Sequence, residues 1–464
     1  MTRSRRSEGP QDRRAAEALR CQFMGGHMKK IFILEKFRLL LFLLFSITAF
    51  VSTTCTSFAA PPYIIKQLTN NDYDDRAPEI NDDGHVVWQG RQGGSDYEIF
   101  LYDGTTINPP PLTINDLDDG GPQINDDGQV VWNQYSWGGP DSEIFLYDGT
   151  TINQITTNDY TDSAPQINDN GHVVWWGNPP SSYTEYRQSG TEIFLYDGTT
   201  ISRITTNDYE EGWPKIGNNG HVVWEGGYIG EDYEIFLHDG TTINQITTND
   251  LDDRGHQIND HGHVVWNARD GSDSEIFLYD GTTTNQITTN DYNDLFPQIN
   301  KIGHVVWQGM PTGEDVEIFL YDGTTIDQIT TNDDFDRTPQ INDNGHVVWQ
   351  GGSPVEVETR EIFLYDGTTI NQITNNDYTD GTPQINNHGC LTWVGWDGLD
   401  GEIFLACPGV TIKPPLFCFP TCEPFGWFGC DHFAFRCYIL PAIIVIFPII
   451  IIWWFWIYRR RQQP

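Results

Sequence analysis

The stretch PQINDNGHVVW at residues 339–349, followed by EIFLYDGTTINQIT at residues 361–374, decides the fold because the chain repeats it eight times. One glycine of the motif marks each copy: Gly84, Gly128, Gly171, Gly220, Gly262, Gly303, Gly345 and Gly389. Successive glycines are 41 to 49 residues apart. A repeat of this length with four short β-rich runs is typical of a propeller blade. We therefore predict an all-β fold, a β-propeller of four-stranded antiparallel blades, with eight blades and, as the alternative, seven.

Each repeat divides into four predicted strands. PQIN is short and partly polar, as expected for the innermost strand, and the NDNG or NDDG after it is a tight-turn signal, since Asn, Asp and Gly tolerate a positive φ. HVVW is the second strand and EIFLY the third, both rich in β-branched or aromatic residues. After a DGTT turn, TINQIT is the outermost strand. The tryptophans that end HVVW, from Trp88 to Trp393, are interpreted as packing between blades rather than as an aromatic ligand cage.

Two segments compete to close the ring. Residues 64–69 resemble the outermost strand TINQIT, so the N-terminal end of the repeat region can supply the fourth strand of the last blade. Residues 410–413 resemble the same strand. Either closure hides an open sheet edge.

The two ends of the chain carry export and membrane signals. Residues 1–59 are predicted to be an N-terminal extension and signal peptide, with Met28 as an alternative start, because a basic segment precedes an apolar core at residues 39–51 and small residues follow it. Residues 61–415 hold the repeats. Residues 438–458 contain no charged residue and are long enough for a transmembrane helix or a removed sorting segment, and the basic tail 459–464 is expected in the cytoplasm. The propeller would then lie outside the cytoplasm, in the periplasm or at the cell surface.

Cysteine usage agrees with export. Cys390 and Cys407 stand at the beginning of one predicted strand and the end of its antiparallel neighbour, so we predict a disulfide between them. The predicted neck, residues 416–437, holds Cys418, Cys422, Cys430 and Cys437, which allow three pairings. A zinc site is the alternative for these four, but an oxidising compartment favours disulfides.

The charge of the chain excludes one class of partner. It has 65 acidic and 26 Lys and Arg residues, a net charge of −39, and the basic residues gather at the two ends. The acidic repeats would repel phosphates, so we expect no nucleic acid partner. A surface of this kind suits cations, basic partners or high solubility.

The acidic connection between blades is the candidate metal site. An aspartate heads each connection, and a second acid follows two or three residues later. Carboxylates with backbone carbonyls are the oxygen ligands that calcium prefers, although the spacing matches no EF-hand. The alternative is an Asx-turn or a hydrogen bond to the backbone of the loop. The candidate calcium ligands are Asp72, Asp116, Asp159, Asp208, Asp250, Asp291, Asp333 and Asp377.

The order of the motifs resembles a known family. P-x-x-N-D-x-G-x-V-V-W, then EIFLYDG, then I-T-x-N-D is similar to the TolB-type (WD40-like, PD40-like) β-propeller repeat, with NDNG at residues 168–171 where SPDG is usual. The resemblance covers about three quarters of the chain and implies a bacterial surface propeller. Members of that family serve protein scaffolding, peptide hydrolysis and sugar lysis, so the resemblance implies the fold and not one activity.

The loop between the second and third strands varies in length and content, and variable loops on a rigid scaffold are where binding usually lies. It opens on the same face as the acidic connection. The candidate binding residues on this face are Asp159, Asp162, Trp213 and His256, of which His256 replaces the proline of the repeat. The histidines before VVW (His85, His172, His221, His263, His304 and His346) are interpreted as hydrogen-bonding residues rather than a metal ring.

The sequence favours a surface or envelope module that binds a protein or glycan. It contains no G-x-S-x-G elbow, no H-E-x-x-H and no P-loop, which are the local signatures of several enzyme classes. The alternative is a hydrolase or lyase that acts on polysaccharide or peptide.

Overall fold

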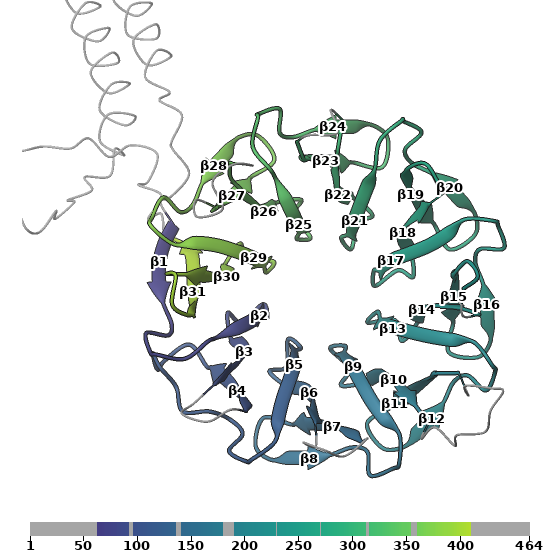
Figure 1. The fold of residues 1–464 in the computed structure, drawn as a ribbon, viewed down its shortest axis with the longest axis horizontal. Helices are drawn as coiled ribbons and strands as arrows, with labels where there is room; N and C mark the ends of the chain where they lie inside the picture. Colours follow the sequence, from purple (N-terminus) through teal and green to yellow (C-terminus); the bar gives the residue numbers. More distant parts are fainter. Residues whose placement is uncertain are drawn as a thin grey trace, which may run out of the picture. The chain divides into compact units, whose positions relative to one another are not determined.

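The computed structural model describes residues 63–91, 96–135, 141–179, 190–228, 230–269, 271–311, 315–353 and 360–409. These residues form β-strands β1 to β31 and no helix, which confirms the all-β prediction. They belong to one compact unit, in which the sheets stand around an open centre (Figure 1). The predicted signal peptide, neck, transmembrane segment and tail, with Cys418, Cys422, Cys430 and Cys437, lie outside the described residues. Among the described residues, no helix is long and apolar enough to cross a membrane.

Each repeat begins with an innermost strand and continues into a buried second strand. The innermost strands are β2 (Arg76–Ile80), β5 (Asp118–Ile124), β9 (Thr161–Ile167), β13 (Glu210–Ile216), β17 (Asp252–Ile258), β21 (Asp294–Ile299), β25 (Arg337–Ile341) and β29 (Thr379–Ile385). The second strands are β3 (Val86–Arg91), β6 (Val130–Tyr135), β10 (Val173–Asn178), β14 (Val222–Gly227), β18 (Val264–Arg269), β22 (Val305–Gly309), β26 (Val347–Gly351) and β30 (Leu391–Trp396). The glycine of the turn between them has a φ between 76° and 90° in every repeat, which confirms the predicted tight turn.

The third and outermost strands complete each repeat. The third strands are β4 (Tyr97–Tyr102), β7 (Ser142–Tyr147), β11 (Glu192–Tyr196), β15 (Glu234–His238), β19 (Ser274–Tyr279), β23 (Glu317–Tyr321), β27 (Glu361–Tyr365) and β31 (Gly401–Pro408). The outermost strands are β8 (Ile152–Gln154), β12 (Ile201–Arg203), β16 (Ile243–Gln245), β20 (Thr284–Gln286), β24 (Ile326–Gln328), β28 (Ile370–Gln372) and β1 (Tyr63–Gln67). The strand predicted over TINQIT is shorter than expected, because only its INQ-type centre pairs with the third strand in most repeats.

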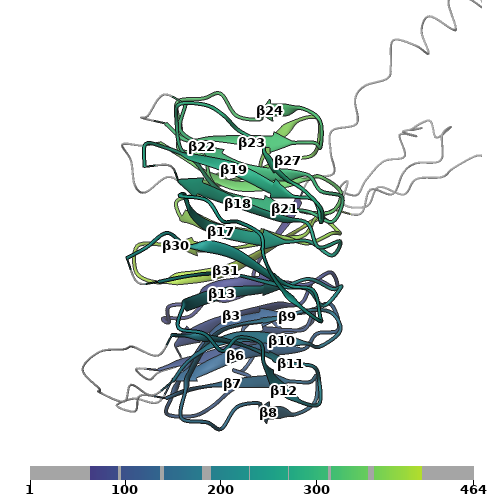
Figure 2. The same cartoon turned by 90° about the vertical axis from the view of Figure 1, so that its right-hand side faces the viewer.

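The strands pair repeat by repeat. Four-stranded antiparallel sheets such as β13-β14-β15-β16 and β21-β22-β23-β24 each hold one repeat. The strands β5 to β12 form one larger sheet, because a single parallel contact between Ser142 and Thr161 joins two repeats. Seen from the side, the strands of successive sheets are stacked and run between the two faces of the ring (Figure 2).

The first repeat ends differently from the others. Its sheet, β2-β3-β4, has three strands in the described part of the chain. Pro109, Pro110 and Pro111 stand where other repeats have the outermost strand, and proline has no N–H to donate to a sheet. One isolated bridge, Phe100 to Pro111, and the bond from Leu112 N to Ile99 O hold this segment to β4.

The N-terminal strand closes the ring. β1 pairs antiparallel with β31, from Tyr63 opposite Pro408 to Gln67 opposite Phe404. Of the two candidate segments, residues 64–69 thus supply the fourth strand of the last repeat. The rival segment, residues 410–413, lies outside the described residues.

The core lies between neighbouring sheets. Val87 and Ile99 of the first repeat pack in one cluster with Val130 and Trp132 of the second, and clusters of the same kind recur around the ring. Each tryptophan that ends HVVW is at most 1% exposed. Trp88 also stacks on Phe100 of its own sheet, with ring centroids 5.6 Å apart. The predicted packing role of these tryptophans is confirmed.

Polar side chains link the sheets near the centre. In seven repeats, the side-chain amide of the asparagine after PQI donates to a backbone carbonyl of the next repeat, at 2.8 to 3.0 Å. The donors are Asn81, Asn125, Asn168, Asn259, Asn300, Asn342 and Asn386. The bond from Asn386 to Asn81 O joins the last repeat to the first. Gly217 takes the place of the asparagine in the fourth repeat.

Cys390 and Cys407 form a disulfide, with Cα atoms 4.2 Å apart and a sequence separation of 17 residues. A crosslink over a loop of this size stabilises a fold by about 3 kcal/mol in the chain-entropy model. We expect the double variant Cys390→Ser, Cys407→Ser to lose about that much free energy of unfolding, measured by urea denaturation without reductant. Equal midpoints for the variant and the parent protein would contradict this prediction.

Candidate functional site

One residue of each innermost strand has an unusual backbone conformation. It comes immediately before the proline of PQIN, or before His256 in the fifth repeat, and its φ lies between 50° and 66°. The residues are Ala77, Gly121, Ala164, Trp213, Gly255, Phe296, Thr338 and Thr382. The pairing register with the second strand shifts at this point in the fourth, fifth and sixth repeats among others. We call these residues the bulge column.

A positive φ is costly for residues other than glycine, and more so for bulky ones. Because the whole column adopts it, the conformation belongs to the blade and is not a peculiarity of one repeat. The two aromatic members, Trp213 and Phe296, are exposed by 63% and 58%. The bulge thus presents a large aromatic side chain to solvent from the innermost strand in these two repeats.

Trp213 lies between two cavities on the face that carries the variable loops. The first has a volume of about 480 Å³ and is lined by residues of the first four repeats, among them Tyr97, Tyr135 and Trp176. The second has a volume of about 280 Å³ and is lined by Glu210, Glu225, Tyr233 and Arg254. Trp176 and Trp213 line both. We call them the aromatic cavity and the charged cavity.

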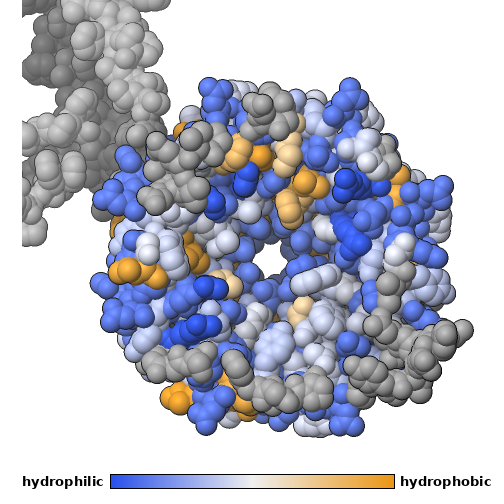
Figure 3. Space-filling model, in the orientation of Figure 1, coloured by the Kyte–Doolittle hydropathy of each residue, from blue (hydrophilic) through white to orange (hydrophobic). Residues whose placement is uncertain are grey.

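Figure 3 looks onto this face of the ring. Hydrophilic residues cover most of it, and small apolar patches lie close to the central hole. Trp213 lines its two cavities together with polar residues such as Asn133 and Glu210. Such a mixture suits a ligand that offers both apolar faces and hydrogen-bonding groups.

His256 lies beneath Trp213 rather than in a cavity. It is 3% exposed, its Nε2 is 2.9 Å from Trp213 O, and its Nδ1 is 3.6 Å from Glu225 Oε2. The predicted binding residue His256 thus contacts the backbone of the predicted binding residue Trp213. Its place in the structure is that of a support for Trp213.

Arg254 organises the charged cavity. Its guanidinium lies 3.9 Å from the centroid of the Tyr233 ring, its Nη1 is 3.3 Å from Glu225 Oε1 and its Nε is 2.9 Å from Asp252 Oδ2. Since Glu225 is nearly buried, this arginine compensates a carboxylate that would otherwise lie in a low dielectric. Neither the arginine nor the glutamate was identified from the sequence. Glu225 is the one acidic residue at a position that holds Gln or Asn in five other repeats, a deviation that could have drawn attention to it.

Asp162 has a structural role. It is fully buried, and its carboxylate accepts hydrogen bonds from Trp175 Nε1 at 3.0 Å and Asn158 Nδ2 at 2.7 Å. The interpretation of Asp162 as a residue that faces a ligand is corrected by this burial. Asp159 is exposed, so it remains accessible on the connection.

The same arrangement recurs in all eight repeats. The second acid of each connection accepts a hydrogen bond from the buried indole N–H at 2.8 to 3.2 Å. An asparagine four residues earlier donates to the same carboxylate. We call this the Trp–acid–Asn trio. Its acids are Asp75, Asp119, Asp162, Glu211, Asp253, Asp294, Asp336 and Asp380.

The eight candidate calcium ligands, Asp72 to Asp377, are all exposed. Among the described residues, no three His, Cys, Asp or Glu side chains gather in a way that could hold a metal ion. The asparagine before each candidate aspartate, and not the aspartate itself, makes the Asx-turn of the connection. In the third repeat, for example, Asn158 Oδ1 accepts a hydrogen bond from Tyr160 N. Calcium binding stays a prediction.

The histidines of HVVW lie against the next repeat. His85 in the first repeat, for example, lies beside Gly128 in the second. If Gly128 carried a Cβ atom, that atom would be 3.6 Å from His85 Nδ1. The part of the chain that the structure describes contains no metal-ligand group among them. Their side chains therefore fill the space between turns of neighbouring repeats.

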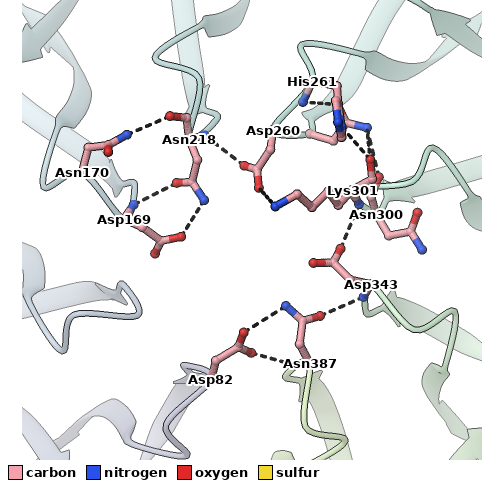
Figure 4. Close-up of polar contacts among 11 residues, drawn as sticks. Asp82, Asp169, Asn170, Asn218, Asp260, His261, Asn300, Lys301, Asp343 and Asn387 are labelled. Atoms are coloured by element: carbon pink, nitrogen blue, oxygen red, sulfur yellow. Dashed lines mark hydrogen bonds and ion pairs between the residues drawn. The ribbon is translucent and has the colours of Figure 1, made fainter.

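Aspartates surround the other end of the central channel, where a cavity of about 360 Å³ lies. Each carboxylate or amide oxygen here accepts the backbone N–H of the preceding repeat, as when Asp169 accepts from Asp126 N at 3.0 Å and Asp343 accepts from Lys301 N at 2.9 Å. Figure 4 shows that Lys301 breaks the pattern. Its Nζ is 3.5 Å from Asp260 Oδ2. These aspartates are therefore already used to join the repeats.

Comparison with known proteins supports the fold. No protein-family model and no curated protein matches the sequence. Among solved structures, the chain is similar to one from a study of two prolyl endopeptidases, with 10% identity, a TM-score of 0.51, and coverage of 70% of this chain and 54% of that one. This likeness, at such low identity, shows a β-propeller fold and nothing about activity.

Two further solved structures have TM-scores of 0.46. One is the β-propeller domain of the Trilobed protease from Pyrococcus furiosus, with 15% identity, covering 65% of this chain and 98% of that one. The other is an acylaminoacyl peptidase from Pyrococcus horikoshii, with 12% identity, covering 70% and 57%. The chain thus spans little more than half the length of the two peptidase chains. The TolB-type family itself is not among these findings and remains an expectation from the sequence.

Buried carboxylates of the trio make stability depend on pH. Burial raises the pKa of Asp162, Asp253 and Asp294 to about 6, and that of Asp75 and Glu211 to about 7. In an unfolded chain, the pKa of an aspartate is about 3.9 and that of a glutamate is about 4.3. Between these values the folded protein binds protons that the unfolded chain does not, so the free energy of unfolding falls as pH rises.

We therefore expect a higher thermal midpoint at about pH 5 than at about pH 8, measured by calorimetry at constant ionic strength. Below about pH 4, the exposed aspartates of the DGTT turns, such as Asp148 and Asp197, reverse the trend. Hydrogen bonds from the following threonines lower their pKa, so protonating them costs stability. A midpoint that climbs steadily from about pH 5 to about pH 8 would refute the prediction.

Proposed function

We propose that the chain is an exported, membrane-anchored, eight-bladed propeller of the TolB type that binds an envelope or extracellular protein or glycan. The eight repeats, each with its own strand set, support the blade number. The signal-like residues 1–59 and the apolar residues 438–458 are the reasons to place it outside the cytoplasm. The binding surface is the face that carries the variable loops, and calcium stabilises its acidic connections.

Trp213 is the observation that carries this proposal. A large aromatic side chain, 63% exposed, is costly to leave in water. Here it also has the positive φ of the bulge column, its backbone carbonyl contacts the buried His256, and it stands between two cavities. Rigid aromatic side chains next to polar groups are the usual centres of binding energy in interfaces.

We expect Trp213→Ala to weaken binding of the partner roughly 10-fold or more. Binding would be measured on a glycan array and in pull-downs from envelope extracts, with full-length protein. Phe296→Ala is the matched control, because Phe296 occupies the same bulge position two repeats away and lines neither cavity. Loss of binding in both variants, or in neither, would contradict a site centred on Trp213.

A second candidate function is hydrolysis or lysis of a polysaccharide or peptide. The observation in its favour is the pair of nearly buried side chains Glu225 and His256 beside the charged cavity, 3.6 Å apart. At this distance the two groups make no direct hydrogen bond, so proton transfer between them would need a bridging water or a closer approach on ligand binding. The test is to incubate the protein with polysaccharides and peptides and to measure the release of products. If products form, and if His256→Ala abolishes their release without lowering the thermal midpoint, the function is catalysis and not binding.

Calcium binding has a direct test. If the ion bridges the acidic connections, the thermal midpoint rises in millimolar calcium and returns on adding chelator. Magnesium at the same ionic strength is the control for charge screening. A midpoint that is the same in calcium, magnesium and chelator would remove calcium from the proposal.

A further inference from the structure

The aromatic cavity contains a buried donor without a partner. Asn133, in β6, is 4% exposed, and its Nδ2 is a buried atom that makes no hydrogen bond. The residue lines the aromatic cavity together with Asp118, Tyr135 and Trp213. Buried amide donors are almost always satisfied, so a free one at the wall of a cavity points to a ligand acceptor.

Asn133 differs from the glutamine that occupies its position in the first, sixth and seventh repeats. At the equivalent position, Gln89 Oε1 accepts from Gly121 N at 2.9 Å, and Gln350 Oε1 accepts from Thr382 N at 3.0 Å. Both glutamines reach the bulge column of the next repeat. Asparagine is one methylene shorter, and the structure gives it no corresponding bond to Ala164. The second repeat has therefore exchanged a link between sheets for a free amide at the cavity.

The other groups of the cavity limit the ligand. Its volume of about 480 Å³ falls in the range of small-molecule sites, roughly 300 to 1,000 Å³. Tyr135 and Trp213 are 45% and 63% exposed and offer flat apolar surfaces. Asp118 also lines the cavity, and its carboxylate accepts from Tyr97 N at 2.9 Å. The ligand must therefore combine an apolar face with hydrogen-bond acceptors and donors.

Charge narrows the ligand further. The chain carries a net charge of −39, and Asp118 and Asp119 are part of this cavity. Such a field repels uronates, sulfated sugars and phosphates. A peptide that adds a strand needs free backbone N–H groups, but Gly121 N, at the cavity wall, is already bonded to Gln89. An uncharged sugar meets all of these conditions, since its ring has an apolar face and its hydroxyls both donate and accept.

We propose that the aromatic cavity binds one uncharged sugar ring of a glycan, with the ring against Trp213 and Tyr135 and a hydroxyl oxygen accepting from Asn133 Nδ2. This assignment rests on the proposed binding function of the same face and names its ligand class. It gives Asn133, which no sequence pattern singled out, the role of selecting the ligand.

The test compares Asn133→Ala with Asn267→Ala in the full-length protein. Asn267 occupies the equivalent position in the fifth repeat and does not line the aromatic cavity. The probes are neutral gluco- and manno-oligosaccharides, an oligogalacturonate and a basic peptide, measured by titration calorimetry. We expect Asn133→Ala to weaken neutral oligosaccharide binding roughly 10-fold, Asn267→Ala to leave it unchanged, and the thermal midpoint to stay the same or rise in Asn133→Ala. Tyr135→Ala is expected to weaken it as well.

Three results would overturn the inference: neutral oligosaccharide binding that Asn133→Ala leaves unchanged, oligogalacturonate binding as tight as that of the neutral sugars, or Asn133-dependent binding of the peptide alone. Failure of this inference is distinct from failure of the proposed function. If a partner from the envelope extract is lost with Trp213→Ala but kept with Asn133→Ala, the face binds and the sugar site is wrong. If Trp213→Ala has no effect on any partner, the proposed binding face itself is wrong.

Discussion

The hydrogen bond from a buried tryptophan to a buried acid is the interaction on which each blade depends. In the second repeat, Trp132 Nε1 donates to Asp119 Oδ1 at 3.0 Å, and Asn115 Nδ2 donates to Asp119 Oδ2 at 2.7 Å. One carboxylate thus joins the innermost strand, the second strand and the connection from the preceding blade. Removing any of the three partners would leave a buried polar group unsatisfied, which costs about 1 to 3 kcal/mol.

This trio constrains its surroundings. In the third repeat, a Cβ on Gly177 would lie 2.6 Å from Asp162 Oδ1 and 2.8 Å from Phe194, so the second strand has glycine there to make room for the carboxylate. Similar crowding exists at Gly309 and Gly351. The burial that makes the trio strong also raises the pKa of its acid, and the asparagine and indole donors offset part of that cost. A fold built from eight such carboxylates therefore loses stability as the pH rises from mildly acidic to neutral.

The scaffold is symmetric, and the candidate site arises where the symmetry is broken. The bulge column presents small residues in most repeats but Trp213 in the fourth. Asn133 has lost the link to the next blade that Gln89 and Gln350 retain, and Glu225 and Arg254 introduce charge beside Trp213. Each change occupies a position whose backbone is fixed by the repeat. A new side chain therefore appears on the binding face without disturbing the sheet beneath it.

The sequence by itself determined the period, the strand order and the turns, because these depend on local residue types that recur eight times, and it narrowed the ring closure to two candidate segments. PQIN, HVVW and EIFLY form strands in every repeat, and residues 64–69 pair where their likeness to TINQIT predicted. The pairing of Cys390 with Cys407 also followed from strand ends, and Trp213 was a deviation visible in the repeat. The sequence could not separate the exposed acid Asp159 from the buried acid Asp162, since both are aspartates in the same acidic connection. Only the tertiary structure decided that Asp162 meets Trp175, that His256 supports Trp213, and that Asn133 faces a cavity. Those facts depend on contacts between residues that lie 13 to 43 positions apart in the sequence. They also depend on the side of the bulge to which each side chain points. A linear sequence pattern encodes neither.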